Sequence, residues 1–388
     1  MIENMKKIAI IGGGAAGMIC AVQLASYGKN VVVFERGARL GRKLSATGNG
    51  QGNVTNLNVD AARYFTDDRE KLSRLLSRYG AESFIRFLEG MGGIFLPDAR
   101  GRVYPASRQA SAVTDLLRRE LVRLGVEVRC DAHVTKMSAQ GSGLILFGEG
   151  FQMHADAVVF AAGGKAAENF GTDGSAFALA EAFGHTVTQL KPALVPLRCR
   201  QEEVRGLKGI RVDAILRVMR EKKEIYQSRG DVLFTDNGVS GDAVFRASSY
   251  AQEGDLLLVD FLPDVSDGRL ERALSSSDGE DSLLCVVNNG LGRMLWKRAH
   301  GEKNKVVTLI KSFPLTVTGT LGFGRAQVTR GGIPLKETDG RLMSTKRSGL
   351  YFAGEALNVD GECGGYNLQW AFTSASCVAE GIYGTHAE

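Results

Sequence analysis

The chain has 388 residues, of which 44% are hydrophobic and 23% charged, and its formal net charge is +5. This length accommodates two or three domains, and the composition is typical of a globular protein. No apolar run reaches membrane-spanning length, and the charge is too small for a protein that coats nucleic acid. We therefore expect neither a membrane nor a nucleic acid as partner, whereas an anionic small molecule fits the charge.

Cysteine and histidine are spaced in ways that exclude several kinds of site. The six cysteines form no C-x-x-C pair, and the five histidines form no H-x-x-x-H motif. A disulfide framework, a metal site and a dithiol redox pair are therefore not expected. The first residues, Met1 to Lys7, lead into an apolar run without the pattern of a cleavable signal, which indicates a cytoplasmic protein.

Residues 8–17 predict a strand, a tight turn and the start of a helix. An apolar run too short for a helix is followed by glycines in G-x-G-x-x-G spacing. Gly12 permits the turn, Gly14 lets the backbone approach a pyrophosphate, and Gly17 lets the helix pack closely on the strand. Alone, this spacing is a weak signal in a chain with 49 glycines.

The following residues strengthen the prediction of a dinucleotide site. The helical pattern ends at Gly28, and its first turn, at Ala15 and Ala16, offers free N–H groups to phosphates. A second apolar strand, 31–34, ends at Glu35, near the position where an acid binds ribose hydroxyls. The alternative is an ordinary βαβ unit whose glycines have no special role.

A basic segment and a Gly- and Asn-rich segment come next. Residues 36–43 hold four cations, which alone would indicate a solvated loop. After a dinucleotide fingerprint, Arg36, Arg42 and Lys43 are expected to neutralise phosphates. The next loop can follow a flat ligand and bind its edge, and the candidates in it are Thr47, Asn49, Gly50 and Asn53.

This region resembles the YhiN/BaiN-type FAD-dependent oxidoreductases, flavoproteins of glutathione-reductase-like topology. The motifs that carry the resemblance are Gly41-Arg42-Lys43-Leu44, Ala46-Thr47-Gly48-Asn49-Gly50 and Asn53-Val54-Thr55-Asn56. The resemblance covers nearly the whole chain and implies FAD as cofactor. The family loop reads Gly-Arg-Cys-Asn where this chain has Gly50-Gln51-Gly52-Asn53, so roles of that arginine or thiol do not carry over.

The end of the chain carries a second set of motifs of this family. An apolar strand ends at Gly354-Glu355, and an apolar helix starts near Gly365. The resemblance implies that Gly354 and Glu355 hold the ribityl and phosphate region of FAD. It also implies that the helix N-terminus faces the flavin ring, with Asn367 and Leu368 in its first turn.

The segment up to residue 191 supplies further elements of the cofactor domain. Helical spacing covers 66–92 and 110–124, and strands are expected at 126–134 and around 143–154. By the resemblance, Val134 contacts the adenine through its backbone. Another buried strand ends at Ala162 and Gly163, which resemble the second flavin-side motif of the family.

The middle of the chain has a different pattern. Alternating stretches typical of antiparallel strands lie at 194–197, 214–219, 232–234, 256–261, 315–317 and 323–328, with helices expected at 242–250 and 266–310. We predict an α/β fold with an FAD-binding Rossmann-like domain of glutathione-reductase type formed by 1–191 and 337–388. The pattern alone indicates a second domain of mixed structure at 192–336. The resemblance implies that this domain is an antiparallel β domain inserted on the substrate side, with a small helical subdomain at about 266–310.

The predicted function is that of an FAD-dependent oxidoreductase with a small-molecule substrate. The resemblance implies that hydride passes between flavin N5 and the substrate, either in NAD(P)H-linked reduction of a conjugated enone or in oxygen-linked oxidation of an amine. A second dinucleotide fingerprint is absent from the sequence, so NAD(P)H is expected only as a transient electron donor. No catalytic acid or base is assigned.

Two alternatives remain. One is an FAD-containing protein that modifies tRNA, for which the short basic clusters Lys222-Lys223 and Arg293-Lys297-Arg298 would provide a surface, although solvated side chains explain them equally well. The other is a flavin-binding protein without catalytic turnover.

Overall fold

The computed structural model describes residues 7–276 and 279–384, and the chain divides into two compact units. Unit 1 comprises the chain up to Lys191 and from Val328 onward, and unit 2 comprises Pro192–Gln327. Residues 328–336, expected in the inserted domain, therefore lie in unit 1. The reason is Thr329, whose hydroxyl accepts hydrogen bonds from the backbone N–H groups of residues 165 and 166 at 2.7 and 2.8 Å.

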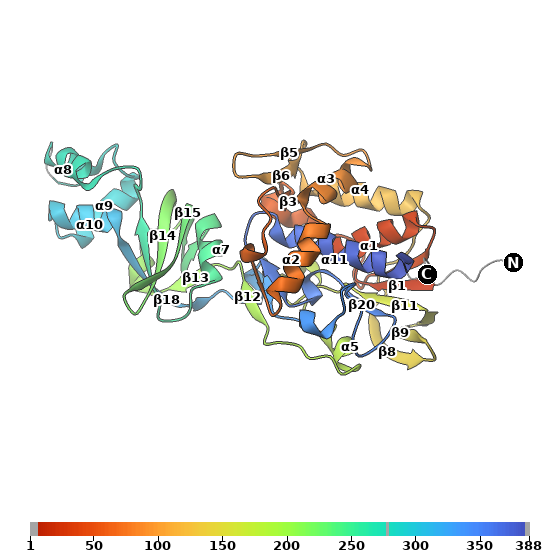
Figure 1. Ribbon diagram of the computed structural model, residues 1–388. Helices are drawn as coiled ribbons and strands as arrows, with labels where there is room; N and C mark the ends of the chain where they lie inside the picture. Colours follow the sequence, from red (N-terminus) through yellow and green to blue (C-terminus); the bar gives the residue numbers. More distant parts are fainter. Residues whose placement is uncertain (1–6, 277–278, 385–388) are drawn as a thin grey trace. The chain divides into compact units, whose positions relative to one another are not determined.

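A parallel five-stranded sheet with the order β20-β11-β1-β2-β7 forms the centre of unit 1 (Figure 1). Its strands are β1 (Lys7–Ile11), β2 (Asn30–Phe34), β7 (Glu127–Arg129), β11 (Ala157–Phe160) and β20 (Leu350–Phe352). Ile8 in β1 lies opposite Val31 on one side and Ala157 on the other. The order of the strands therefore reverses at β1, and ligands of such sheets bind at the carboxyl ends beside this switch point.

Helices bury the faces of this sheet. The helices of unit 1 are α1 (Ala15–Ser26), α2 (Arg69–Arg78), α3 (Ala81–Glu89), α4 (Ala110–Arg123), α5 (Phe177–Glu181) and α11 (Tyr366–Tyr383). Helices α1 and α11 pack against each other, and α1 also contacts α4. The helical pattern expected at 66–92 is split into α2 and α3, because Gly80 adopts an extended conformation between them.

Small antiparallel sheets complete unit 1. One is β3-β6-β5, a second is the meander β10-β9-β8, and β21 pairs with β4. Their bounds are β3 (Thr55–Asn56), β4 (Tyr64–Thr66), β5 (Phe95–Pro97), β6 (Arg102–Pro105), β8 (Val134–Gln140), β9 (Gly143–Gly148), β10 (Phe151–Ala155) and β21 (Val359–Gly361). The strand β3 lies beside α11, which brings the loop after β2 and the end of the chain together.

Unit 2 is built on a closed antiparallel barrel with the order β13-β16-β15-β14-β17-β18. The strands are β13 (Leu197–Cys199), β14 (Arg211–Arg220), β15 (Lys223–Thr235), β16 (Gly238–Ser240), β17 (Leu256–Asp260) and β18 (Phe313–Thr320). Alternate residues of these strands, such as Leu216, Val232 and Leu257, are fully buried, as expected for a barrel interior. Two further short strands, β12 (Lys191–Ala193) and β19 (Val328–Arg330), lie at the two ends of this segment.

The helices of unit 2 are α6 (Gln201–Val204), α7 (Asp242–Ser248), α8 (Asp267–Ser275), α9 (Asn289–Arg298) and α10 (Lys303–Lys311). Figure 1 shows α8, α9 and α10 gathered at one end of the barrel. The helical subdomain expected at 266–310 is thus three helices. The strand expected at 323–328 is wrong for most of its length: a single 3-10 turn, Phe323–Arg325, follows Gly322, whose positive φ of 76° ends the extended chain.

The predicted fold class is confirmed: a Rossmann-like α/β domain interrupted by an antiparallel β domain with a helical part. Among the described residues, no helix has the length and apolarity needed to span a lipid bilayer. The same residues contain no group of three or more His, Cys, Asp or Glu side chains placed to hold a metal ion.

Candidate cofactor-binding site

The three glycines of the fingerprint, in the turn between β1 and α1, differ in what an added Cβ atom would contact. A Cβ atom at Gly12 would collide with the Ala161 carbonyl, and φ at Gly12 is +106°. A Cβ atom at Gly17 would collide with the carbonyl of Gly12. Packing within the protein therefore requires both glycines, whatever the protein binds.

Gly14 differs from these two glycines. Its φ of −76° is open to any residue, and no heavy atom lies within 4 Å of the position that its Cβ would occupy. Neither packing nor backbone conformation therefore explains the missing side chain, and glycine's preference over alanine at an N-cap explains it only in part. Open space at the exposed end of a helix is what a ligand that approaches the backbone requires.

The N-terminus of α1 begins at the exposed Gly14. Among the described residues, no side chain caps the helix, and its first turn, which begins at Ala15 and Ala16, contains no acid. The middle of the helix is buried in the core, and its two ends are exposed, at Gly14 and at Ser26. A phosphate at the N-terminus would meet unsatisfied N–H groups and the positive end of the helix dipole.

Glu35 closes the turn as well as facing it. Its Oε2 accepts a hydrogen bond from Gly13 N at 2.8 Å, and its Oε1 accepts one from Gly37 N at 2.7 Å. The sequence had suggested a carboxylate reserved for ribose hydroxyls. Each oxygen retains a second lone pair for a hydroxyl, but the carboxylate also holds the turn.

The segment that leads to Val134, the residue predicted to contact the adenine, is hydrogen-bonded to the segment at Glu35. The N–H of Ala132 donates to Glu35 O at 2.9 Å, and the N–H of Asp131 donates to Gly37 O at 3.1 Å. Val134, buried at the start of β8, follows directly. The structure thus places Val134 on the same side of the sheet end as the acid.

The three cations expected at the phosphates all contact the loop after β11. Arg36 Nε donates to Gly171 O at 2.6 Å and forms an ion pair with Asp173. Arg42 donates to the carbonyl of residue 169 at 2.7 Å. Lys43 Nζ donates to the carbonyl of Ala166 at 3.4 Å and is also 2.6 Å from a carboxylate oxygen of Glu355, which lies after β20.

These partners change the expected roles of the cations. The charges of Arg36 and Lys43 are balanced by carboxylates, and hydrogen bonds from Ser175 and Arg36 lower the pKa of Asp173 to about 2 against the effect of its burial. Within the described residues, Arg42 has a carbonyl but no carboxylate as partner. Arg42 is therefore the cation of this loop best able to neutralise a phosphate.

Ala162 and Gly163 continue β11 at the carboxyl end of the sheet. Both are partly exposed, and Gly163 has a φ of +77°. The backbone beyond them is held by the Thr329 hydroxyl. The sequence analysis did not identify Thr329 as part of the site. The only signal near it in the sequence is the glycine pair Gly331-Gly332, and the structure shows that both of these glycines have positive φ.

The loop at 46–51 is the open part of the site. Asn49 and Gly50 are exposed, and both have positive φ, 54° and 83°. Thr47 and Asn53 use their side chains to shape the loop: Thr47 Oγ1 donates to Leu44 O at 2.8 Å, and Asn53 Nδ2 donates to two carbonyls. Asn53 therefore supports the loop and does not extend its amide donors from it.

The replacement of the family's cysteine has a local steric consequence. Gly52 has a φ of +76°, and a Cβ atom there would lie 2.9 Å from the Cα of Ala110. A thiol at this position does not fit this loop conformation.

The N-terminus of α11 is open in the same sense as that of α1. Gly365 is its N-cap, with no side-chain cap and no acid in the first turn, and Leu368 is only partly buried there. A Cβ at Gly365 would collide with the backbone of Thr55 in β3, so this glycine is required for packing. Gly354 is likewise explained by packing, since its Cβ would be 2.7 Å from the Cβ of Ala16.

One predicted side chain points elsewhere. Asn367 Oδ1 accepts from Gly361 N at 2.9 Å, and its Nδ2 donates to Gly361 O at 2.8 Å. The amide therefore braces the loop between β21 and α11, and the expectation that it donates to a flavin is not supported by this geometry. Glu355 also has protein partners, since its Oε1 accepts from Thr329 N at 2.9 Å.

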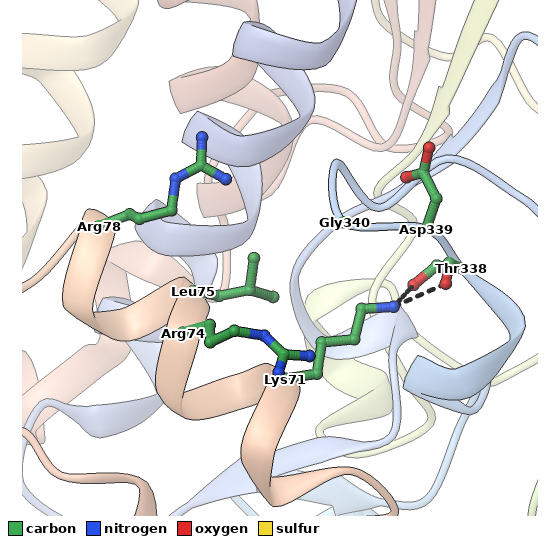
Figure 2. A pocket seen from close by; sticks show the side chains of 7 residues that line it. All are labelled: Lys71, Arg74, Leu75, Arg78, Thr338, Asp339 and Gly340. Atoms are coloured by element: carbon green, nitrogen blue, oxygen red, sulfur yellow. Dashed lines mark hydrogen bonds between the residues drawn. The ribbon is translucent and has the colours of Figure 1, made fainter.

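A cavity of about 320 Å³ lies apart from these residues, between α2 and the turn at 338–340 (Figure 2). Figure 2 shows Lys71 reaching across it to Thr338, and the ammonium group also donates to Leu335 O at 2.7 Å. Arg74 and Arg78 are paired with Glu70 and Glu380. The cations of this cavity are thus used to hold the protein together.

Comparison with known proteins gives the family. The model of the HI0933-like protein Rossmann domain matches residues 6–381. The chain belongs to the HI0933-like family. The resemblance found in the sequence is thereby confirmed.

Three relatives of this HI0933-like chain have been assigned reactions. One, from Clostridium scindens, is named 3-dehydro-bile acid delta(4,6)-reductase and is 32% identical, with 95% of this chain and 97% of that protein aligned. Two are named ribosomal RNA dihydrouridine synthase: the Escherichia coli protein is 28% identical and the Haemophilus influenzae protein 30%, each with 96% of this chain and 97% of the relative covered.

Solved structures agree on the architecture. A 3-ketosteroid delta1-dehydrogenase from Sterolibacterium denitrificans has a TM-score of 0.56 at 12% identity, covering 98% of this chain and 100% of that one. A 3-ketosteroid-delta4-(5alpha)-dehydrogenase from Rhodococcus jostii has a TM-score of 0.52 at 15% identity, covering 98% of both. At these identities the likeness shows the fold. With its family and its dinucleotide-type turn, the chain is an oxidoreductase of flavoprotein type.

Proposed function

We propose that this chain binds FAD in unit 1 and reduces a carbon–carbon double bond conjugated to a carbonyl group. The observation that supports the cofactor most directly is Gly14, whose missing side chain is not required by packing or by backbone conformation. The observation that supports the reaction is chemical. A bile acid delta(4,6)-reductase and a dihydrouridine synthase both carry names for the reduction of such a bond.

The residues present fit FAD along its length. The N-terminus of α1 behind Gly14, with Arg42 nearby, would hold the pyrophosphate. Glu35 would accept hydrogen bonds from the adenosine ribose, and Val134 would lie beside the adenine. The open loop around Asn49 and the N-terminus of α11 would lie along the flavin.

Bound and reduced, FAD supplies a hydride. The chain's own contribution is to hold the cofactor and the electron-poor carbon in one orientation. An uncapped N-terminus of a helix such as α11 stabilises negative charge by about 0.3–1 kcal/mol when exposed and up to about 2 kcal/mol when partly buried. It would therefore favour the anionic reduced cofactor over the neutral oxidised one.

The relatives' names describe reductions, which favours enone reduction with NAD(P)H as electron donor over oxidation of an amine. Two substrate classes have this bond. One is a steroid-like 3-keto-4-ene, as the bile acid relative's name suggests. The other is the uracil ring of RNA, whose C5–C6 double bond is conjugated to the C4 carbonyl, as the dihydrouridine synthase names suggest.

The test is anaerobic reduction followed by a choice of acceptors. The purified protein should be yellow, should release FAD on denaturation, and should be bleached by NADH or NADPH. The reduced protein is then mixed with a 3-keto-4-ene steroid, with a uridine-rich RNA, or with air, and reoxidation is followed at the flavin absorbance.

Fast reoxidation by one of the two conjugated substrates, with formation of the saturated product, supports the proposal and selects the substrate class. Reduction of the flavin by amines, together with reoxidation only by air, would establish amine oxidation instead. If neither NAD(P)H nor an amine reduces the bound flavin, the chain is a flavin-binding protein without catalytic turnover. A protein that takes up no FAD on reconstitution contradicts the cofactor assignment.

A further inference from the structure

The helices α9 and α10 form a hairpin, residues 289–311 (Figure 1), which carries six of the twenty Lys and Arg residues of unit 2. This segment holds six Lys or Arg residues and a single acid, Glu302. Its net charge therefore equals the +5 of the whole chain. The remainder of the protein is close to neutral, so the hairpin is a local concentration of positive charge.

The cations of the hairpin differ in their surroundings, and Lys305 on α10 forms an ion pair of 2.6 Å with Glu302. Arg298 lies over the ring of Phe313, 4.8 Å from its centroid, and Lys311 forms an ion pair of 2.7 Å with Asp260. These two hold the helices to the barrel. Arg293 and Lys297 are exposed, and within the described residues neither has an ion-pair partner.

The positions of the exposed cations destabilise the helices that carry them. Arg293 and Lys297 are four residues apart on α9, and like charges at this spacing destabilise a helix by about 0.2–0.5 kcal/mol. Lys303 and Lys305 lie in the first turn of α10, at the positive end of its dipole, where cations are unfavourable. Lys305 is partly compensated by an ion pair of 2.6 Å with Glu302, whereas the repulsion between Arg293 and Lys297 would be relieved by a bound polyanion.

The surface of the hairpin offers nothing for an apolar partner. Its exposed side chains are Asn289, Arg293, Lys297, His300, Glu302, Asn304, Lys305 and Thr308. Trp296 is partly buried, with its ring packed at Gly301 and against the core of unit 2. A membrane-surface helix needs exposed apolar side chains, and protein interfaces centre on buried aromatic anchors, so both partners fit poorly.

We propose that the α9–α10 hairpin is an RNA-binding surface that contacts the phosphate backbone. Exposed Lys and Arg with Asn and Thr side chains between them are the donors that bind phosphate and sugar without reading sequence. The choice of RNA among polyanions rests on the second substrate class of the proposed function. The position of the surface rests on the charges of the hairpin alone.

The experiment measures binding of the full-length protein to a fluorescein-labelled 20-nucleotide uridine-rich RNA as a function of salt. The test variant is Arg293→Gln/Lys297→Gln/Lys305→Gln. The matched control removes three exposed cations elsewhere in unit 2, Arg269→Gln/Arg272→Gln/Lys223→Gln. Circular dichroism, the melting temperature and the FAD content check that both variants fold as the wild type does.

The hairpin variant should bind RNA at least tenfold more weakly than wild type at low salt. The slope of log affinity against log salt should become shallower by about two, because each phosphate contact on a single strand contributes about 0.7. The slope of the control variant should differ from the wild-type slope by less than about half of the change seen in the hairpin variant. Reduction of a small enone should be the same in all three proteins, since the hairpin is no part of the cofactor site.

Equal loss in the two variants would show that only bulk charge matters and would overturn the proposal. So would the absence of RNA binding by the wild type, or binding to vesicles of phosphatidylglycerol and phosphatidylcholine in place of RNA. If the protein does not reduce a small enone but its RNA binding still depends on the hairpin, the proposed small-molecule substrate is wrong and the proposed RNA-binding surface is supported. The two failures are therefore distinguishable.

Discussion

The Gly14→Ala variant provides the sharpest test of the cofactor site, because it separates folding from binding. The backbone at Gly14 is extended, with a φ of −76°, and the added methyl group would meet no heavy atom within 4 Å. Alanine at an N-cap costs about 0.5–2 kcal/mol relative to the best cap residues, and loss of glycine's unfolded-state freedom returns about 0.4–1 kcal/mol. The melting temperature of the apoprotein should therefore change by only a few degrees.

The same methyl group would occupy the space through which a pyrophosphate reaches the helix N-terminus. Losing one hydrogen bond to a charged group costs about 1.5–3 kcal/mol, which corresponds to a roughly tenfold to hundredfold weaker affinity for FAD. Fluorescence titration of the apoprotein with FAD measures this affinity, and a thermal melt without FAD measures the folding. Gly17→Ala is the matched control, because its methyl group collides with the Gly12 carbonyl and should cost stability instead.

An FAD affinity for Gly14→Ala within twofold of wild type, in a protein that melts normally, would refute the reasoning. The open space at Gly14 would then have no connection with a ligand. Loss of FAD together with a large drop in melting temperature would also refute it, because the glycine would then be needed by the fold.

Three further predictions follow from the same geometry. Glu35→Gln removes one of the two oxygen acceptors for the backbone N–H groups of Gly13 and Gly37. It should therefore weaken FAD binding and also lower the melting temperature of the apoprotein by several degrees. An unchanged melting temperature of the apoprotein would mean that the carboxylate serves only the ligand. Arg42→Gln should weaken FAD binding about tenfold, while Arg36→Gln, whose charge is already balanced, should have a much smaller effect; the reverse order in the titrations would contradict the assignment. Burial lowers the pKa of His185, so the unfolded chain binds a proton that the folded one does not, and stability should fall as the pH drops below about 6.5, with a slope of up to about 1.4 kcal/mol per pH unit; urea unfolding of His185→Gln should lack this slope, and an identical slope would assign it to other groups.

The environment of His185 shows why this last effect is structural. Its Nδ1 is 2.8 Å from Glu337 Oε2, and its Nε2 is 2.6 Å from Ser344 Oγ. The order serine, histidine, carboxylate resembles that of a hydrolase, but Ser344 is buried and its hydroxyl accepts hydrogen bonds from the N–H groups of residues 346 and 347. The group therefore fastens the loop 337–347 and has no access to a substrate.

The sequence alone determined those features that depend on neighbouring residues. The strand, turn and helix from Lys7 to Ser26 follow from an apolar run, glycine spacing and helical periodicity, all of which are local. The alternation in the middle of the chain likewise indicated antiparallel strands. Where the local signal was interrupted, as at Gly80 between α2 and α3 or at Gly322, the predicted bounds were wrong.

Only the tertiary structure decided what each candidate side chain contacts, because the partners lie far apart in the sequence. Asn367 looked like a donor for the cofactor and is held by the loop before α11, while Arg36 is balanced by Asp173. The glycines show the same limit. Gly14 and Gly365 read alike in the sequence, yet Gly365 is required by the backbone of β3, and only Gly14 is left for a ligand to explain. The role of a glycine depends on the atoms that a side chain at its position would contact, and these atoms come from parts of the chain that only the fold brings together.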